Sequence, residues 1–555
     1  MIISKTIDGK NIYTSWRENG EKITKVEPFR PYFYVEDNVN VPKYRPSKFT
    51  QRDFEYEEGE FFNLEGRRLK KAYVESSFDV YKAKDSINRT YEADVPYHFR
   101  YAVDNIQTMP EYDMRKWYWD MEWQQGGEHH DKITTIVVYD NYDKQFFQWV
   151  WFPNQEPYDG FKMSTKEVAH MSVFNTEKDM LEDFMLTVVE KDPDMLIAWF
   201  GQRFDLPKLI ERACEVGLNP LILSPITSVK GVKKKGNGFK FAYGEKGFSP
   251  IEQPIGGRIT LSLDLAFERQ WNDSQRGTLP SLSLEYVSQL LFKEGKVKES
   301  KFTDKNEFFR RAWLEDTEVY LDYAVVDVEL IRRIDETNFC SEAILSLQRL
   351  LKAPFDACFY ASHMGSIYFM RNASWKAPTG DRNVERKDYD GAMIYDPLSE
   401  GTNGLHLNVA AFDFAGLYPS MMISRNISWE TKSSEPTEFG VNILTPRDFS
   451  ITDREQMFYY KTDELGLLPR AVLELKELRN EYKRLMKEAR LADNQSEYVK
   501  WNNNQMAVKR LMASFYGIVA FQGFGWADVD LAASITASAR EAIRLAAFKA
   551  KEMKE

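Results

Sequence analysis

Residues 406–423 read HLNVAAFDFAGLYPSMMI, and the expected fold class follows from this stretch. Alternation places one set of apolar residues on the same face of a predicted strand as Asp413, and this set is Leu405, Leu407, Val409 and Ala411. A carboxylate at the end of an apolar strand is costly unless a group of opposite charge pairs with it. A divalent metal ion is one such group. The alternative is that Asp413 ends the strand and caps the next helix, a position that Asp favours.

Residues 413–420, DFAGLYPS, resemble motif A of the family B DNA polymerases, DxxxLYPS, of the viral or archaeal type. The resemblance implies that Asp413 binds a pair of catalytic Mg²⁺ ions, for which Mn²⁺ can substitute. It also implies that Leu417 and Tyr418 contact the incoming nucleotide, with Tyr418 under the deoxyribose as a steric gate against ribonucleotides. Residues 426–428, NIS, are similar to the continuation of the same motif.

A second acidic group precedes this motif in the chain. In residues 116–123, KWYWDMEW, Asp120 and Glu122 lie on one face of a predicted strand. Their charges repel, and a shared metal ion removes that penalty. The alternative is that the pair simply lies on a half-exposed strand face. Two further carboxylates favour the metal site: one follows an apolar strand, and the other lies four residues after a tyrosine on a predicted helix, and these residues are Asp205, Tyr323 and Asp327.

Together these residues resemble the Exo I, Exo II and Exo III motifs of a 3′–5′ proofreading exonuclease with an RNase H-like fold. The resemblance implies that the carboxylates hold two metal ions about 4 Å apart, and that Tyr323 orients the attacking water. One residue departs from the family pattern. Phe200 stands where the family has an asparagine that helps to hold the single-stranded end. The replacement of this asparagine by Phe200 is expected to affect the binding of the single-stranded end more than the chemistry of the metal ions.

Residues 467–491 are predicted to form a helix with a continuous basic stripe. The stripe consists of Lys476, Arg479, Lys483, Lys487 and Arg490. Such a stripe is often solvated surface, and acidic residues on the same helix offer an alternative pairing: Glu474, Glu477 and Glu481.

A second predicted helix, residues 501–516, carries Gln505, Lys509, Ala513 and Tyr516 on one face and ends in SFYG. It resembles motif B, Kx3NSxYG. The resemblance implies that the cations Arg479, Lys483 and Lys509 bind the triphosphate of a dNTP, for which arginine and lysine are suited. Tyr516 then packs near the nascent base pair. Ala513 replaces the family asparagine, so nucleotide affinity is expected to be lower or differently apportioned.

Two other segments indicate a protein that binds nucleic acid. Residues 389–392, YDGA, resemble the family's Y-x-G-G/A motif, which implies that Tyr389 and Gly391 bind DNA. Residues 230–248 contain GNG with basic and aromatic flanks, which predicts a β-hairpin or a mobile loop, and this segment is either solvated or in contact with a phosphate.

The expected fold is a mixed α/β and α+β multidomain architecture. It combines an N-terminal β-rich domain, an RNase H-like 3′–5′ exonuclease domain, and a partial polymerase palm with helical fingers. The expected bounds are 1–105 for the N-terminal domain, 106–340 for the exonuclease, 341–375 for a return segment of the N-terminal domain, 376–466 for the first palm segment, 467–516 for the fingers and 517–555 for the start of the second palm segment, which stops before motif C.

No D-T-D sequence, the motif C of the family, occurs in the chain, although in-line phosphoryl transfer on two metals calls for a second palm carboxylate. We therefore expect the N-terminal piece of a split DNA polymerase, with motif C and the thumb on a second polypeptide. A truncated sequence is the alternative explanation. The expected partners are primer–template DNA, dNTPs and that second chain, with a sliding clamp as a further candidate. Alternative functions are a stand-alone 3′–5′ exonuclease and a non-catalytic primer–template binding subunit.

The amino-acid composition limits the class of protein and the cellular compartment that the sequence predicts. The net charge of −11 argues mildly against a general nucleic-acid binder but says nothing about local grooves. The 3 cysteines lack CxxC spacing, which fits a reducing compartment and indicates no zinc site. No apolar run of about 18 residues occurs. These features predict a soluble, cytoplasmic protein with no membrane partner.

Overall fold

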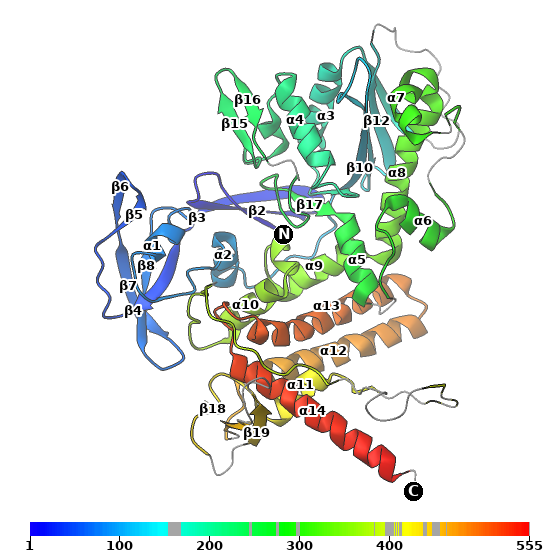
Figure 1. Ribbon diagram of the computed structural model, residues 1–555. Coiled ribbons are helices and arrows are strands. Elements are labelled where there is room, and N and C mark those ends of the chain that lie inside the picture. The colour runs from blue at the N-terminus through cyan, green and yellow to red at the C-terminus, as the bar shows by residue number, and fades with distance from the viewer. Residues whose placement is uncertain are drawn as a thin grey trace. The chain divides into compact units, whose positions relative to one another are not determined.

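The computed structural model (Figure 1) describes residues 1–153, 168–243, 247–273, 277–295, 300–302, 304–381, 383–393, 404–405, 407, 409, 413–436, 441–446, 455–461 and 463–553. The chain forms two compact units, and each is built from two separate segments. Unit 1 contains residues 1–29 and 104–359, and unit 2 contains residues 30–103 and 360–555. The expected N-terminal domain, residues 1–105, is thus divided between them, and the other expected domain bounds remain predictions.

A six-stranded mixed sheet forms the centre of unit 1, with the order β13-β12-β11-β10-β14-β17. Its strands are β10 (Lys116–Trp123), β11 (Ile133–Asp140), β12 (Gln145–Trp151), β13 (Val168–Phe174), β14 (Met195–Ala198) and β17 (Ile259–Ser262). β10 pairs antiparallel with β11 and parallel with β14. Parallel neighbours need a crossover connection, and α3 (Glu177–Lys191) is the helix between β13 and β14.

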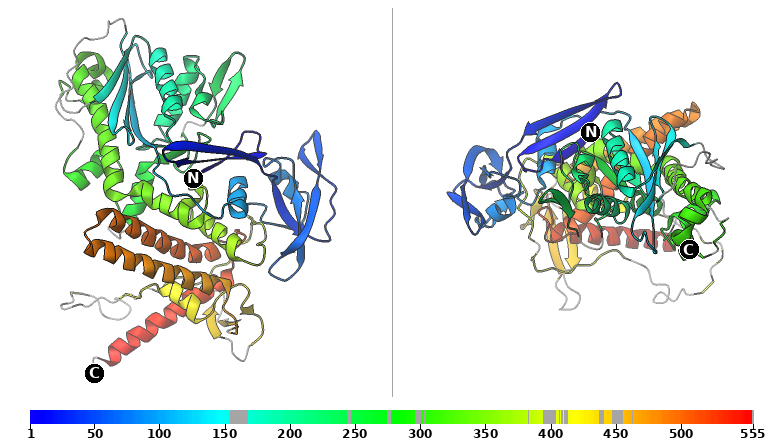
Figure 2. Two further views of the ribbon diagram at one scale, coloured as in Figure 1. Left: turned by 180° about the vertical axis from the view of Figure 1, so that it is seen from behind. Right: turned by 90° about the horizontal axis from the view of Figure 1, so that it is seen from above.

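The two faces of β10 contact different helices, as its alternation predicts. Trp117 and Trp119, both at least 98 % buried, contact Phe184 of α3. On the opposite face, the Tyr118 hydroxyl donates to Asp335 Oδ2 at 2.8 Å. Asp335 belongs to α8 (Thr317–Asn338), which runs along the sheet (Figures 1 and 2). The acidic face of β10 therefore lies against α8.

The other elements of unit 1 complete its core. The first three strands form a separate antiparallel sheet, and the basic segment after η1 forms the predicted hairpin. These elements are β1 (Ile2–Lys5), β2 (Asn11–Glu18), β3 (Glu21–Pro28), α4 (Asp205–Glu215), η1 (Pro220–Leu223), β15 (Val232–Lys235), β16 (Gly238–Phe241), α5 (Leu263–Asp273), α6 (Leu284–Phe292), α7 (Lys305–Glu315), α9 (Cys340–Leu351) and η2 (Phe355–Cys358).

Unit 2 begins with a small β domain. A four-stranded sheet of order β7-β8-β4-β9 and a two-stranded sheet of β5 and β6 enclose a core around Phe33 and Tyr44, both fully buried. The aromatic residues of this region thus include core residues. The elements are β4 (Tyr32–Glu36), β5 (Lys43–Ser47), β6 (Thr50–Asp53), β7 (Glu55–Phe62), β8 (Arg68–Tyr73), α1 (Val80–Lys84), β9 (Thr90–Tyr91) and α2 (Tyr97–Asn105), which runs across the boundary between the units.

The remainder of unit 2 is mainly helical. Helices α12 (Leu467–Leu491) and α13 (Gln495–Ala520) form a long helical hairpin that is plain in both views (Figures 1 and 2). The predicted bounds of α12 are confirmed, and α13 extends beyond the predicted 501–516 at both ends. The other elements are α10 (Ala361–Asn372), α11 (Leu417–Ser424), β18 (Lys432–Ser433), β19 (Val441–Pro446), β20 (Glu455–Tyr460) and α14 (Val529–Glu552).

The predicted strand before Asp413 is wrong for the residues that the structure describes. Leu405, Leu407 and Val409 lie outside any strand and are 91 %, 80 % and 73 % exposed, while residues 406, 408 and 410–412 lie outside the described residues. A strand needs a neighbour for its backbone hydrogen bonds, and the described sheet nearest in sequence, β18-β20-β19, pairs only within itself. In the described residues, no helix is long and apolar enough to cross a membrane.

Candidate functional sites

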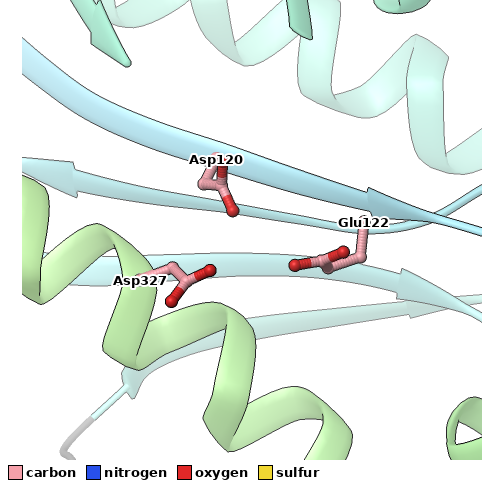
Figure 3. Close-up of side chains that lie close together, drawn as sticks. All are labelled: Asp120, Glu122 and Asp327. Carbon is pink, nitrogen blue, oxygen red and sulfur yellow. The ribbon is translucent and has the colours of Figure 1, made fainter. Parts of the chain in front are cut away.

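Three carboxylates meet on the α8 side of the central sheet. Asp120 and Glu122 come from β10 and Asp327 from α8, and Figure 3 shows the three side chains pointing toward one another. One oxygen from each lies within 4.8 Å of the others. Glu122 and Asp327 are 91 % and 98 % buried, and Asp120 is partly buried. Among the described residues this is the cluster whose geometry fits a metal ion.

The charge of this cluster explains why it calls for a cation. Two carboxylates about 4.8 Å apart repel by roughly 3.5 kcal/mol at an effective dielectric constant of about 20. Hard oxygen ligands suit Mg²⁺ or Mn²⁺, so the donor set fits a divalent ion. The same charges act on a neighbour: burial, followed by the negative charge of Glu122, raises the pKa of Tyr320 well above its usual value. The Tyr320 hydroxyl lies 2.8 Å from Thr134 Oγ1.

Two other predicted residues lie on the expected elements but outside the three-carboxylate group. Asp205 is the first residue of α4 and is 96 % buried. Its carboxylate does not join the group defined by the 4.8 Å limit. Tyr323 lies one turn before Asp327 on α8, where its ring contacts those of Phe308 and Phe309 at centroid distances of 5.4 and 5.8 Å. Their predicted roles remain predictions.

The loop between β14 and α4 has an unusual backbone. Phe200 has a φ of 58°, a left-handed conformation that is a clear outlier for a bulky residue and costs roughly 1–3 kcal/mol. The loop is held from several directions. Trp199 Nε1 donates to the Leu282 carbonyl at 2.9 Å, Gln202 Nε2 donates to the Thr260 carbonyl at 2.9 Å, and the Gln202 carbonyl accepts from the Phe248 N–H at 2.8 Å. The surroundings therefore impose the strained conformation.

In unit 2, three cations gather where α12 and α13 face each other. Arg479 Nε donates to Gln505 Oε1 at 3.2 Å. Burial, then the positive charges of Arg479 and Lys509, lowers the pKa of Lys483, so these groups lie close enough to repel. Among the residues that the structure describes, no carboxylate within salt-bridge distance pairs with them. Glu481 instead pairs with Arg484 at 2.6 Å.

These three residues, Arg479, Lys483 and Lys509, are called the cation cluster, and their mutual repulsion favours a negatively charged partner. Arg479 and Lys483 are four residues apart on one helix, and a like-charge pair at that spacing destabilises the helix by about 0.2–0.5 kcal/mol. A bound polyanion removes this penalty and gains charge-assisted hydrogen bonds. The alternative, that the helix's own acidic residues neutralise the stripe, does not hold for Arg479 and Lys483.

The predicted nucleotide-contacting tyrosines also come together. The rings of Tyr418 on α11 and Tyr516 on α13 have centroids 4.6 Å apart at an interplanar angle of 54°. The Tyr516 hydroxyl lies 2.9 Å from the Tyr389 hydroxyl. Burial and the hydrogen bond with Tyr389 raise the pKa of Tyr516 above its usual range, so the Tyr516 hydroxyl stays protonated at neutral pH. Leu417 begins α11, and Asp413 is exposed just before it.

Side chains that sequence reasoning missed hold the segment containing Tyr389. Arg540 Nη1 donates to the carbonyls of Asp390 and Gly391 at 2.8 and 2.7 Å, and Thr536 Oγ1 donates to the Asp390 carbonyl at 2.6 Å. The Gln522 amide accepts from the Lys387 N–H and donates to its carbonyl, both at 2.7 Å. The side chains of Gln522, Thr536 and Arg540 thus hold the backbone of the segment that contains Tyr389. We call these three residues the strap anchors. Because they bind backbone atoms about 150 residues away, no local pattern reveals them.

Beyond the anchors, Gly391 is exposed, and a Cβ placed on it meets no atom within 4 Å. The outer side of this segment is therefore open to a ligand that approaches the backbone.

The residues after α11 cap the first helix of the hairpin. Asn426 Oδ1 accepts from the Gly466 N–H at 3.0 Å, and Ser428 Oγ accepts from the Leu468 N–H at 3.1 Å. The first N–H groups of a helix have no partner within it, and these side chains provide partners for α12. The predicted NIS resemblance thus coincides with a structural link from α11 to α12.

Two features suit chemistry on phosphate groups: the carboxylate cluster beside the mixed sheet, which fits a divalent metal ion, and the cation cluster on the helical hairpin. Both features are typical of metal-dependent enzymes that act on phosphates. Comparison with known proteins defines the class further. The model of DNA polymerase family B matches residues 363–554, and that of the family B exonuclease domain matches residues 107–261.

The DNA polymerase of Pyrococcus glycovorans is 26% identical over 99% of this chain and 68% of its own length. Those of Thermococcus sp. strain 9oN-7 and Thermococcus gorgonarius are each 26% identical over 97% of this chain and 66% of their own length. The chain thus spans about two thirds of the length of these relatives. It belongs to the family B DNA polymerases.

Proposed function

We propose that this chain is a subunit of a DNA-directed DNA polymerase that transfers nucleotides from dNTPs to a primer 3′ end and carries 3′–5′ proofreading activity. The observation that carries the proposal is the cation cluster of Arg479, Lys483 and Lys509 on the same helical hairpin as Tyr516. Cations that have no acidic partner among the described residues suit the triphosphate of a dNTP. Tyr418, which contacts Tyr516, closes the space at the sugar.

At the exonuclease site, the proposed metal is Mg²⁺, held by Asp120, Glu122 and Asp327 with Asp205 as a further ligand. A bound divalent ion activates water and stabilises the leaving oxygen. Tyr323 orients that water with its hydroxyl, and Mn²⁺ substitutes for Mg²⁺ because it accepts the same oxygen ligands.

For polymerisation we propose that Asp413 acts with a second carboxylate supplied by a D-T-D sequence on a second polypeptide. The support is the requirement for two carboxylates at a two-metal centre, of which residues 1–555 supply Asp413. Primer–template DNA binds at Tyr389 and Gly391, and a sliding clamp is a further proposed partner.

Primer extension tests the polymerase proposal. The purified chain is assayed with Mg²⁺, four dNTPs and a primer–template, alone and with a candidate partner that carries D-T-D. We expect extension only in the mixture, and its loss when Asp413 is changed to Ala. An Arg484→Ala variant is the matched control, because Arg484 is a cation of α12 that is already paired with Glu481 and Glu488. Extension by the chain alone would contradict the requirement for a second polypeptide.

A stand-alone 3′–5′ exonuclease is the second candidate, because the cluster of Asp120, Glu122 and Asp327 is complete within this chain. Its test is digestion of 5′-labelled single-stranded DNA by the chain alone with Mg²⁺. We expect Asp120→Ala/Glu122→Ala to reduce the rate by at least about 100-fold. Glu329→Gln, on α8 near Asp327 and paired with Arg332, is expected to keep the wild-type rate. Exonuclease activity without extension in any mixture would favour this candidate over the polymerase.

A further inference from the structure

Hydrogen bonds join β10 to α8 beyond one end of the three-carboxylate group. The Tyr118 hydroxyl donates to Asp335 Oδ2 at 2.8 Å, and both side chains belong to residues that are 97 % buried. Ser341, in the first turn of α9, also holds that carboxylate, because its N–H and its Oγ donate to the two oxygens of Asp335, each at 2.7 Å. Tyr118 lies two residues before Asp120 on the same face of β10. The bond between Tyr118 and Asp335 therefore lies one step of the strand's alternation away from the carboxylates.

A second contact lies at the other end of the group and depends on a β-bulge. The register of β10 and β11 shifts between Glu122 and Trp123, where Thr134 is the extra residue of β11. The Thr134 hydroxyl donates to the Glu122 carbonyl at 3.0 Å. Because a hydroxyl has one proton to donate, the Tyr320 hydroxyl of α8 is the donor in its 2.8 Å bond with Thr134 Oγ1. The bulged residue thus links the backbone of Glu122 to α8.

Asp327 lies between these two contacts on α8. Tyr320 precedes it by seven residues and Asp335 follows it by eight, which is about two turns in each direction, or roughly 10 and 12 Å along the helix axis. The hydrogen bonds therefore hold α8 against the sheet on both sides of the point where Asp327 faces Asp120 and Glu122 (Figure 3). The carboxylates repel one another. A helix held at one end relieves this repulsion by tilting away from the strand, and a helix held at both ends does not.

We propose that Tyr118 and Tyr320 are positioning residues of the metal site: their hydroxyls keep β10 and α8 at a fixed spacing, so that the carboxylates of both elements reach the same divalent ion. This inference rests on the metal site of the proposed exonuclease function. Both tyrosines act through the carboxylates and not as ligands. A site whose ligands are already in place loses less conformational freedom when it binds an ion. These hydrogen bonds therefore contribute to metal affinity as well as to the stability of the fold.

The test is Mn²⁺ binding to the whole chain without DNA, measured by electron paramagnetic resonance of the free ion. The Asp120→Asn/Glu122→Gln variant defines the part of the bound Mn²⁺ that belongs to this site. Removal of one hydroxyl, in Tyr118→Phe or Tyr320→Phe, is expected to weaken that binding by about three- to tenfold, the value of one hydrogen bond. Removal of both should weaken it by about 10- to 100-fold, because the two contacts lie far apart and their effects add.

Control variants separate positioning from a general loss of stability. Tyr243→Phe removes a hydroxyl that donates to Glu252 Oε2 at 2.7 Å, and these residues lie on neither β10 nor α8. It should leave Mn²⁺ affinity unchanged, whatever its effect on the unfolding temperature. Thr134→Ser keeps the bridging hydroxyl and should keep wild-type affinity, whereas Thr134→Val should lose as much as Tyr320→Phe. Because Thr134 and Tyr320 act in one chain of hydrogen bonds, Thr134→Val/Tyr320→Phe should bind no more weakly than either single variant.

The outcomes distinguish the inference from the function on which it rests. Wild-type affinity in Tyr118→Phe/Tyr320→Phe would overturn the positioning role and leave the metal site intact. Where thermal unfolding shows that a tyrosine variant does not fold, wild-type affinity in Thr134→Val overturns the role in its place. Mn²⁺ binding that does not depend on Asp120 and Glu122 would refute the metal site and the inference together. The expected affinities in a chain that does not digest DNA would support the positioning role and contradict the exonuclease function.

Discussion

At the scale of single residues, Lys483 shows how a binding site can oppose stability. Its pKa is lowered by burial and by the neighbouring charges of Arg479 and Lys509. The unfolded chain therefore binds the proton more tightly than the folded chain. Between the lowered pKa and the ordinary lysine value, stability rises with pH. A bound triphosphate reverses the shift, since it favours the protonated amine.

Changing Lys509 to Ala is expected to raise the free energy of unfolding slightly, by a few tenths of a kcal/mol, and to weaken dATP binding by about 10- to 100-fold, the value of a charge-assisted hydrogen bond. The pKa of Lys483 should move back toward its ordinary value, so the pH-dependent gain in stability becomes smaller. Denaturant unfolding at several pH values and equilibrium binding of dATP measure these effects.

Arg484→Ala is the control for Lys509→Ala, because it removes a cation that acidic side chains already neutralise. It should leave dATP affinity unchanged. A Lys509→Ala variant that binds dATP as tightly as the wild type would show that the cation cluster is not the triphosphate site.

At the scale of elements, the side chains that cap α12 link this helix to α11. Replacing Ser428, which is fully buried, with Ala leaves the Leu468 N–H without its acceptor. We expect a loss of about 1–3 kcal/mol of stability, measured by urea unfolding. Glu435→Ala, in the loop that follows, removes an exposed side chain and should change stability by less than about 0.5 kcal/mol. Equal stability of Ser428→Ala and the wild type would mean that the cap contributes nothing.

The strap anchors predict a local change in dynamics. Gln522→Ala removes both partners of the Lys387 backbone, so the amide hydrogens of residues 383–391 should exchange faster, by about five- to tenfold for a bond of about 1 kcal/mol. Lys387→Ala is the matched control, because Gln522 binds the backbone of Lys387 and not its side chain. Hydrogen exchange read by mass spectrometry distinguishes the two. Equal exchange in Gln522→Ala and the wild type would contradict the anchoring role.

The sequence predicted the elements whose periodicity is strong. Alternation in β10 and the helical spacing of Tyr323 and Asp327 on α8 placed the acidic cluster, and the basic stripe of α12 placed the first two cations. Alternation failed at the described residues Leu405, Leu407 and Val409, because a period of two shows that a strand is suitable but not that a partner strand exists. The role of Arg540 could not be predicted, since its acceptors are backbone carbonyls and carry no side-chain signature.

At the scale of the whole molecule, the proposed exonuclease metal site and the proposed nucleotide site belong to different compact units. A ligand stabilises the folded state by about 1.4 kcal/mol at ten times its dissociation constant. We therefore expect Mg²⁺ to slow hydrogen exchange mainly in unit 1 and dATP to slow it mainly in unit 2, when exchange is followed in increasing denaturant.

Two variants make this expectation specific. Asp120→Asn/Glu122→Gln should abolish the Mg²⁺ effect in unit 1, and Lys509→Ala should abolish the dATP effect in unit 2. Protection of unit 1 by Mg²⁺ in the Asp120→Asn/Glu122→Gln variant would place the metal elsewhere.

The alternation of segments between the units also affects how the protein is made. Strands β1 to β3 leave the ribosome before residues 104–359, the segment with which they form unit 1. The small β domain of residues 30–103 belongs with a segment that begins only at residue 360. Because synthesis proceeds at about 5–20 residues per second, each early segment waits for seconds to tens of seconds before its partner exists. For that time, a nascent chain of this protein therefore carries segments whose native partner segment is not yet made.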